Sequence, residues 1–290
     1  MHIESIFDSV IPVENFGIAI PVFFGAIDIE IDAISDFSFQ IAPIACNSHY
    51  PTVQQMGKAA AQEVADRICN LLEGKAEINM IFAAAPSQEE FLHHLISDQR
   101  ISWNRINAFH MDEYIGVLPD APQSFGNFLR IRIFDKVPFK NVYYLNGHAT
   151  DLEEECTRYT SLLSQFPTDI VCLGIGENGH IAFNDPDVAN FNDHKLVKIV
   201  KLDHVCRQQQ VNEKCFETLE QVPTEALTLT IPALLKAKWM FCIVPFKNKS
   251  QAVYRTIHGD ISEKCPASIL RRKEKSSLYL DTESAQLLNL

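Results

Sequence analysis

Positive charge is scarce in this chain of 290 residues, and no lysine or arginine occurs before Lys58. A secretory signal peptide begins with a basic segment, so we do not expect one here. The formal net charge is -12. Binding to a phosphate backbone requires a basic face, and this charge balance argues against a general nucleic-acid-binding protein. A few basic residues gathered at one site would still allow a small anionic substrate.

Long uncharged apolar segments are also missing. The apolar run over residues 16–34 contains Asp28, Glu30 and Asp32, so we do not expect it to span a membrane. None of the eight cysteines forms a C-x-x-C pair, and several lie in apolar runs such as VCLG and MFCIV. This pattern is typical of reduced, buried thiols in a cytoplasmic protein rather than of disulfides or a zinc site.

Strand-like and helix-like segments alternate from Phe39 onward. INMIFAAA (78–85) and DIVCLG (169–174) are continuously apolar, as are strands that a parallel sheet buries on both faces. The order predicts one α/β domain over residues 38–290, a doubly wound and mostly parallel sheet with helices on both faces. Residues 1–37 are predicted to be an N-terminal extension, and we assign them no role.

Several helices have recognisable starts. Thr52 with Gln55 forms a capping box ahead of an apolar stripe that Gly74 ends, and Ser87 with Glu90 forms a second box. A third helix is predicted to begin at a cap formed by Asn248. In a doubly wound fold the ligand lies beyond the carboxyl ends of the strands. Three polar loops fall there: AAAPSQEE, FHMDEYIG and GIGENGH.

The segment LGIGENGHIAF (173–183) matches the G-x-G-x-x-G pattern of dinucleotide-binding folds. That site also needs a helix directly after the glycines, and here Pro186 follows in a stretch without helical periodicity. We therefore interpret the glycines as a tight bend that allows close ligand approach, with Gly179 near the substrate and His180 delivered to the pocket. Asn178 and Asp185 flank this histidine and are expected to fix its tautomer.

The loop FHMDEYIG places two acidic residues, Asp112 and Glu113, just past a strand. Adjacent residues tend to point apart, so we expect at most one of them to face the pocket. A partly desolvated carboxylate has a raised pKa that suits a general base. No spacing typical of metal ligands stands out, so acid–base chemistry without a metal or a cofactor is predicted.

Two further segments are candidates for binding an anion. AAAPSQEE offers small residues and a helix N-terminus, although it is equally compatible with a plain strand–helix turn. Lys247 and Lys249 lie at the start of a predicted helix, where cations oppose the helix dipole unless an anion joins them.

Together, HMDEYIG, LGIGENGHIAFNDP, VPTEALTLTIPALL and the later lysine resemble the glucosamine-6-phosphate deaminases, a family in one superfamily with the 6-phosphogluconolactonases. The resemblance runs from about Phe39 to Asp281 in consistent order. It implies an isomerising deaminase of amino-sugar metabolism, labelled a hydrolase, that converts glucosamine 6-phosphate to fructose 6-phosphate and ammonia. No cofactor is implied.

The resemblance also implies roles for matched positions. Asp112 would carry a proton between C2 and C1 of the open-chain sugar, and His180, supported by Asp185, would assist ring opening. The residues matched to the sugar phosphate are Ser87, Arg207 and Lys249. Two departures stand out: Asn178 replaces a usual acid, and Ala84-Ala85-Pro86-Ser87 replaces a usual Gly-Gly-Ser/Thr loop.

Two other functions stay open on the sequence alone. One is a hydrolase of phosphorylated sugar lactones, and the other is a sugar-phosphate sensor without turnover. Regulators with this domain usually carry a DNA-reading helix ahead of it, and residues 1–37 contain no basic residue that would serve one. We expect a small sugar phosphate as the partner, with no nucleic acid and no membrane. The sequence is compatible with a homo-oligomer.

Overall fold

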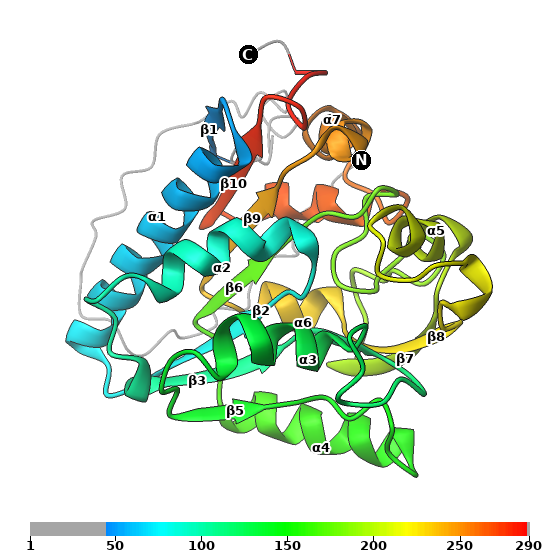
Figure 1. Cartoon of the computed structure of the whole chain (residues 1–290), viewed down its shortest axis with the longest axis horizontal. Helices are drawn as coiled ribbons and strands as arrows, with labels where there is room; N and C mark the ends of the chain where they lie inside the picture. The colour runs from blue at the N-terminus through cyan, green and yellow to red at the C-terminus, as the bar shows by residue number, and fades with distance from the viewer. Residues whose placement is uncertain (1–44, 289–290) are drawn as a thin grey trace, which may run out of the picture. The chain divides into compact units, whose positions relative to one another are not determined.

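The computed structural model describes residues 45–288 (Figure 1). The extension predicted over residues 1–37 lies outside this range. Seven strands form one parallel sheet, in the order β1 (Ala45–Tyr50), β10 (Ser276–Asp281), β9 (Trp239–Val244), β6 (Ile170–Leu173), β2 (Ile78–Phe82), β3 (Ile106–His110) and β5 (Asn141–Tyr143). The predicted α/β class and the parallel sheet are confirmed.

Helices cover both faces of this sheet, as predicted. One apolar core lies under α1 (Val53–Gly74), α2 (Glu89–Ile96) and α3 (Phe125–Leu129), and the other lies under α4 (Leu152–Gln165), α6 (Ile231–Leu235) and α7 (Ser250–His258). Figure 1 shows α1 and α2 side by side. Successive strand residues point to opposite faces, so Met80 and Phe82 enter the first core and Ile81 enters the second.

A second, smaller sheet was not predicted. It is antiparallel, in the order β4 (Asp112–Tyr114), β8 (Glu225–Leu229) and β7 (Val197–Lys201). The segment LVKIVKL is a strand, as its residues indicate, but it joins this sheet rather than the parallel one. Val197 on one face of β7 joins the second core, and Val200 on the other face joins a third apolar cluster. Tyr114, Phe183 and Leu202 also belong to this third cluster, next to α5 (His204–Asn212).

The helix starts agree only in part with the sequence. Thr52 caps α1, since its hydroxyl accepts a hydrogen bond from the backbone N–H of Gln55 at 3.2 Å, and Gly74 is the last residue of the helix. The capping box expected at Ser87 is wrong. A 3₁₀ turn over Pro86–Gln88 precedes α2, and no side chain caps that helix. Asn248 does not cap α7 either, because its amide donates to Glu177.

The sheet order determines where a ligand is expected. From β2 the chain continues to β3 on one side and only later to β6 on the other, so the connections diverge at β2. Ligands of doubly wound folds lie in the crevice at such a switch point, beyond the carboxyl ends of the strands. Within residues 45–288, no helix is both long enough and apolar enough to span a bilayer.

Candidate active site

A pocket lies at this switch point. Loops that follow β2, β3, β6 and β9 contribute to its walls, and α5 closes one side. Its lining includes Ala84, Ser87, Asp112, Gly176, His180, Gln209 and Lys249. Four of the residues that the sequence singles out, Ser87, Asp112, His180 and Lys249, therefore meet in one place although 162 positions separate the first from the last.

The two acidic residues of MDEY point apart. Asp112 lines the pocket, whereas the carboxylate of Glu113 accepts hydrogen bonds from the backbone N–H groups of Tyr114, Phe125 and Gly126 and from the Ser124 hydroxyl, at 2.8–3.1 Å. Glu113 therefore anchors the start of α3. The expectation that at most one of the pair faces the pocket is confirmed, and it is Asp112.

Asp112 has the electrostatics of a general base. Burial, followed by the neighbouring charge of Glu113, raises the pKa of Asp112 well above its ordinary value. A carboxylate with a raised pKa is more basic than an exposed one and can accept a proton from carbon more readily.

The glycines of LGIGENGH form a bend around the histidine. A Cβ at Gly176 would lie 2.2 Å from Cε1 of His180, so only glycine leaves room for the imidazole. Gly179 has a φ of +92°, and a Cβ there would lie 2.8 Å from the Cys265 sulfur. Gly179 does not line the pocket, contrary to our expectation of substrate contact. Gly179 allows the left-handed backbone of the turn, and Gly176 allows the close approach of the His180 ring.

A hydrogen-bonded network holds His180. Its Nδ1 lies 2.9 Å from Oδ1 of Asp185. The Asn178 amide donates to this same oxygen at 2.9 Å and to Asp203 at 2.8 Å, while its carbonyl accepts from the backbone N–H of His180. Asn178 therefore contacts the carboxylates and the backbone, and its amide separates two acidic side chains. Asp203, which the sequence reasoning missed, is part of this network.

The pKa of Asp185 reflects these contacts. Burial alone would raise it, but the hydrogen bond and charge of His180 and the Asn178 amide outweigh burial, so the pKa lies below its ordinary value. An ionised Asp185 at 2.9 Å from Nδ1 favours the tautomer of His180 that carries its proton on Nδ1, with Nε2 unprotonated.

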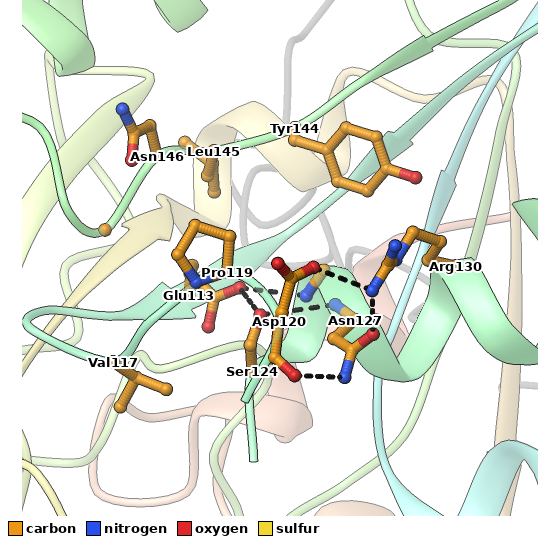
Figure 2. Close-up of a pocket in the computed structure, with 12 residues that line it drawn as sticks. Glu113, Val117, Pro119, Asp120, Ser124, Asn127, Arg130, Tyr144, Leu145 and Asn146 are labelled. Carbon is orange, nitrogen blue, oxygen red and sulfur yellow. Dashed lines mark hydrogen bonds and ion pairs between the residues drawn. The ribbon is translucent and has the colours of Figure 1, made fainter. Parts of the chain in front are cut away.

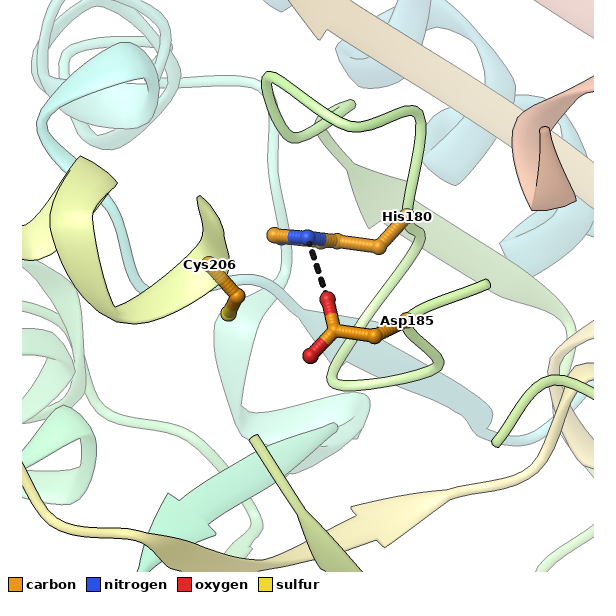
Figure 3. A group of neighbouring side chains, drawn as sticks. All are labelled: His180, Asp185 and Cys206. Atoms are coloured by element: carbon orange, nitrogen blue, oxygen red, sulfur yellow. Dashed lines mark ion pairs between the residues drawn. The ribbon is translucent and has the colours of Figure 1, made fainter. Parts of the chain in front are cut away.

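Figure 3 shows Cys206 beside the pair formed by His180 and Asp185. The ligand atoms of these three residues lie within 4.8 Å of one another, a spacing at which they could bind one metal ion. Burial and the nearby charges of Asp185 and Asp203 raise the pKa of Cys206 well above its ordinary value. Metal binding requires the thiolate, and the oxygens of Asp185 are already hydrogen-bonded, so the donor set does not fit a metal centre.

Lys249 lies deep in the pocket and is paired. Its Nζ lies 2.9 Å from Oε1 of Glu213, and the exposed fractions of the two side chains are 2% and 10%. Gln209 donates to the same carboxylate oxygen at 2.8 Å. Across the pocket, the Ser87 hydroxyl accepts a hydrogen bond from the Gln88 amide at 3.0 Å. The sequence reasoning missed Glu213 and Gln209, and the run of glutamines in CRQQQVNE was the available signal.

Arg207, the candidate phosphate-binding arginine, does not reach the pocket. Its guanidinium donates to the carbonyl oxygens of Leu219 and Val222 at 2.6–3.3 Å. It holds the segment after α5 in place, and it is absent from the pocket lining. Gln209 and Gln210, two and three positions further along α5, line the pocket in its place.

Replacing Arg207 by Ala should therefore lower stability and leave substrate affinity unchanged. We expect a loss of about 2 kcal/mol in the free energy of unfolding, since two carbonyl groups lose a charged donor. KM should stay within about twofold, because no contact with substrate is removed. Urea unfolding and steady-state kinetics on the same preparation measure both. A KM raised by more than tenfold at unchanged stability would instead place Arg207 on the substrate.

A second cavity, of about 340 Å³, lies on the far side of MDEY (Figure 2). Its lining includes Glu113, Asp120, Asn127, Arg130 and Tyr144. The ionised groups there are already engaged: Glu113 anchors α3, and Arg130 donates to Asp120 at 2.9 Å and to Asn127 at 2.7 Å. This cavity lacks an unengaged acid–base pair, so the pocket of Asp112 and His180 is the better candidate.

Known proteins are similar to this chain in both sequence and fold. The model of the glucosamine-6-phosphate isomerase/6-phosphogluconolactonase family matches residues 51–279. A glucosamine-6-phosphate deaminase of Listeria innocua is 36% identical over 212 residues, which are 73% of this chain and 88% of the relative. One of Bacillus cereus is 39% identical over 188 residues, 65% of this chain and 70% of the relative.

Among solved structures, a monomeric glucosamine-6-phosphate deaminase superposes with a TM-score of 0.76 at 31% identity, covering 83% of this chain and 98% of its own. A 6-phosphogluconolactonase of Thermotoga maritima gives a TM-score of 0.64 at 22% identity over 78% of this chain and 94% of its own, which shows the shared fold alone. The chain belongs to the family of glucosamine-6-phosphate isomerases and 6-phosphogluconolactonases.

Proposed function

We propose that this protein isomerises and deaminates an amino-sugar phosphate, converting glucosamine 6-phosphate and water to fructose 6-phosphate and ammonia. The observation that carries the proposal is the meeting of Asp112 and His180 in one pocket at the strand ends. Curated relatives with 36–39% identity are named for the same reaction. These relatives support the isomerase and deaminase assignment and give no support to the separate label of hydrolase.

His180 would act first, on the closed ring. Its Nδ1 is held by Asp185, so Nε2 is the atom able to exchange a proton with the ring oxygen and the C1 hydroxyl. Proton transfer between these oxygens opens the pyranose and exposes the aldehyde at C1. Because Asp185 is ionised, it stabilises the imidazole whenever His180 carries the extra proton.

Asp112 would then move a proton between carbons. Its carboxylate removes the proton from C2, and the electron pair of the broken C–H bond delocalises toward C1 as an enolamine. Returning the proton to C1 gives the imine of the ketose. Water adds to this imine at C2 and ammonia leaves, so the only reagents are the sugar and one water molecule. The raised pKa of Asp112 suits both the removal and the return of the proton.

The proposal is tested with the purified full-length chain and glucosamine 6-phosphate. We expect ammonia and fructose 6-phosphate in equal amounts. Matched assays with unphosphorylated glucosamine and with the lactone of 6-phosphogluconate separate the alternatives. Hydrolysis of the lactone without ammonia release from the amino sugar would favour the lactonase, and binding of the sugar phosphate without any turnover would favour a sensor.

A further inference from the structure

The cation of the pocket already has a partner. Among the described residues that line the pocket, Lys249 is the one lysine or arginine, and its Nζ contacts Glu213 at 2.9 Å. An anion that approaches Lys249 therefore meets a carboxylate at the same atom. Like charges brought together at a desolvated site are strongly unfavourable, so the phosphate group and Glu213 exclude one another.

The carboxylate of Glu213 is held less completely than those of Glu113 and Asp185. Both contacts to Lys249 and Gln209 fall on Oε1, and Oε2 is buried without a hydrogen-bond partner. Glu113, by contrast, has partners on both oxygens. A buried acceptor without a partner costs free energy. The Glu213 carboxylate therefore gains hydrogen bonds if it moves into water.

The position of Glu213 on the chain adds two further energetic costs to its buried state. It directly follows α5, at the negative end of the helix dipole, where a carboxylate is unfavourable without a nearby cation. The next residue, Lys214, has a φ of +61°, a conformation that non-glycine residues seldom adopt. The contact with Lys249 offsets these costs, and a stronger anion on Lys249 would remove that compensation.

The enclosed part of the pocket is small. Its volume is about 60 Å³, which holds only a few water molecules. Gln209 and Gln210 of α5 form one wall, and Glu213 is the residue that directly follows this helix. Displacing Glu213 from Lys249 would loosen this wall at the point where the phosphate has to bind.

We propose that Glu213 is a specificity-determining residue, an internal anion that the substrate's phosphate must displace from Lys249. The inference rests on the proposed function and deepens it, since it concerns how the same site admits its substrate. Glu213 weakens the binding of simple anions such as inorganic phosphate. A sugar phosphate that also contacts Asp112 and His180 has additional binding energy with which to displace it.

The test compares Glu213→Gln with Glu217→Gln, a matched change on an exposed side chain of the same loop that does not line the pocket. Calorimetry measures the affinity of the full-length protein for inorganic phosphate. We expect Glu213→Gln to bind it at least about tenfold more tightly and to show a lower KM for glucosamine 6-phosphate. Glu217→Gln should match the unaltered protein in both respects. Equal phosphate affinity in all three proteins would overturn the proposal.

A second variant, Glu213→Asp, tests the same proposal if Glu213→Gln does not fold. Aspartate keeps the charge but is one methylene shorter, so it should hold Lys249 less well and bind phosphate with intermediate affinity. Affinity no higher than that of the unaltered protein would count against the role of Glu213. Phosphate binding does not require turnover, so a protein without deaminase activity but with this order of affinities would refute the proposed function and leave the inference standing.

Discussion

Asp112→Asn is expected to reduce ammonia release from glucosamine 6-phosphate by about 10³-fold or more, because Asp112 is the one carboxylate among the described residues that line the pocket beside His180. Asparagine has almost the same shape but accepts no proton from carbon. KM should change little, since the amide still occupies the carboxylate's position. Steady-state kinetics at saturating sugar phosphate measure the loss. Activity retained within about tenfold would refute the role given to Asp112.

The same variant should not lose stability. The folded-state pKa of Asp112 is raised above its unfolded value by burial and by Glu113, so ionising this carboxyl destabilises the fold as the pH rises through the folded pKa. Asparagine removes that penalty. The free energy of unfolding of Asp112→Asn relative to the unaltered protein should therefore increase with pH. Asp120→Asn, a change on an exposed side chain, is the control and should alter neither activity nor this pH dependence.

Asn178→Asp is expected to lower kcat/KM by about 100-fold at pH 8, although it restores the residue type usual in the resembling family. Here the Asn178 amide donates to both Asp185 and Asp203 at 2.8–2.9 Å. A carboxylate in its place would face two others, and each contact costs about 6 kcal/mol at an effective dielectric constant of 20. The cluster avoids most of this by taking up a proton, which withdraws negative charge from His180. Because the loss comes from this extra proton, it should persist toward about pH 5 and shrink only as the pH rises through the raised pKa of the cluster.

A second change should recover much of this activity. In Asn178→Asp/Asp203→Asn, the amide and one carboxylate exchange places, and an asparagine at position 203 still caps α5. We expect the double variant to be at least about tenfold more active than Asn178→Asp alone, a coupling that a double-mutant cycle isolates. Equal activities of the single and double variants at every pH would show that Asp203 does not set the charge of this network.

Local features of the sequence predicted most of the fold. Continuous apolar segments identified β2 and β6, and the Thr52 cap and the Gly74 stop gave the limits of α1. The small antiparallel sheet escaped prediction because β4 has only three residues and pairs with β8, more than 100 positions away. Strand pairing over such a distance depends on tertiary packing, which local periodicity does not encode.

The lining of the pocket was predictable where a residue follows the end of a strand. Asp112 and His180 are of this kind, and the alternation of side chains along MDEY correctly separated Asp112 from Glu113. The position of Arg207 was not predicted, because its guanidinium donates to the carbonyl of Val222, a contact that the local sequence does not mark. Glu213 was missed because its partner, Lys249, is 36 residues away and nothing local marks the pair.

The central claim, that Asp112 carries the proton between C2 and C1, is tested most directly in D₂O. Nuclear magnetic resonance can follow loss of the C2 hydrogen of glucosamine 6-phosphate and the appearance of deuterium at C1 of the ketose. The account predicts exchange with the unaltered protein and none above background with Asp112→Asn, whose fold is checked by its unfolding transition. Exchange at an equal rate in both proteins would contradict it.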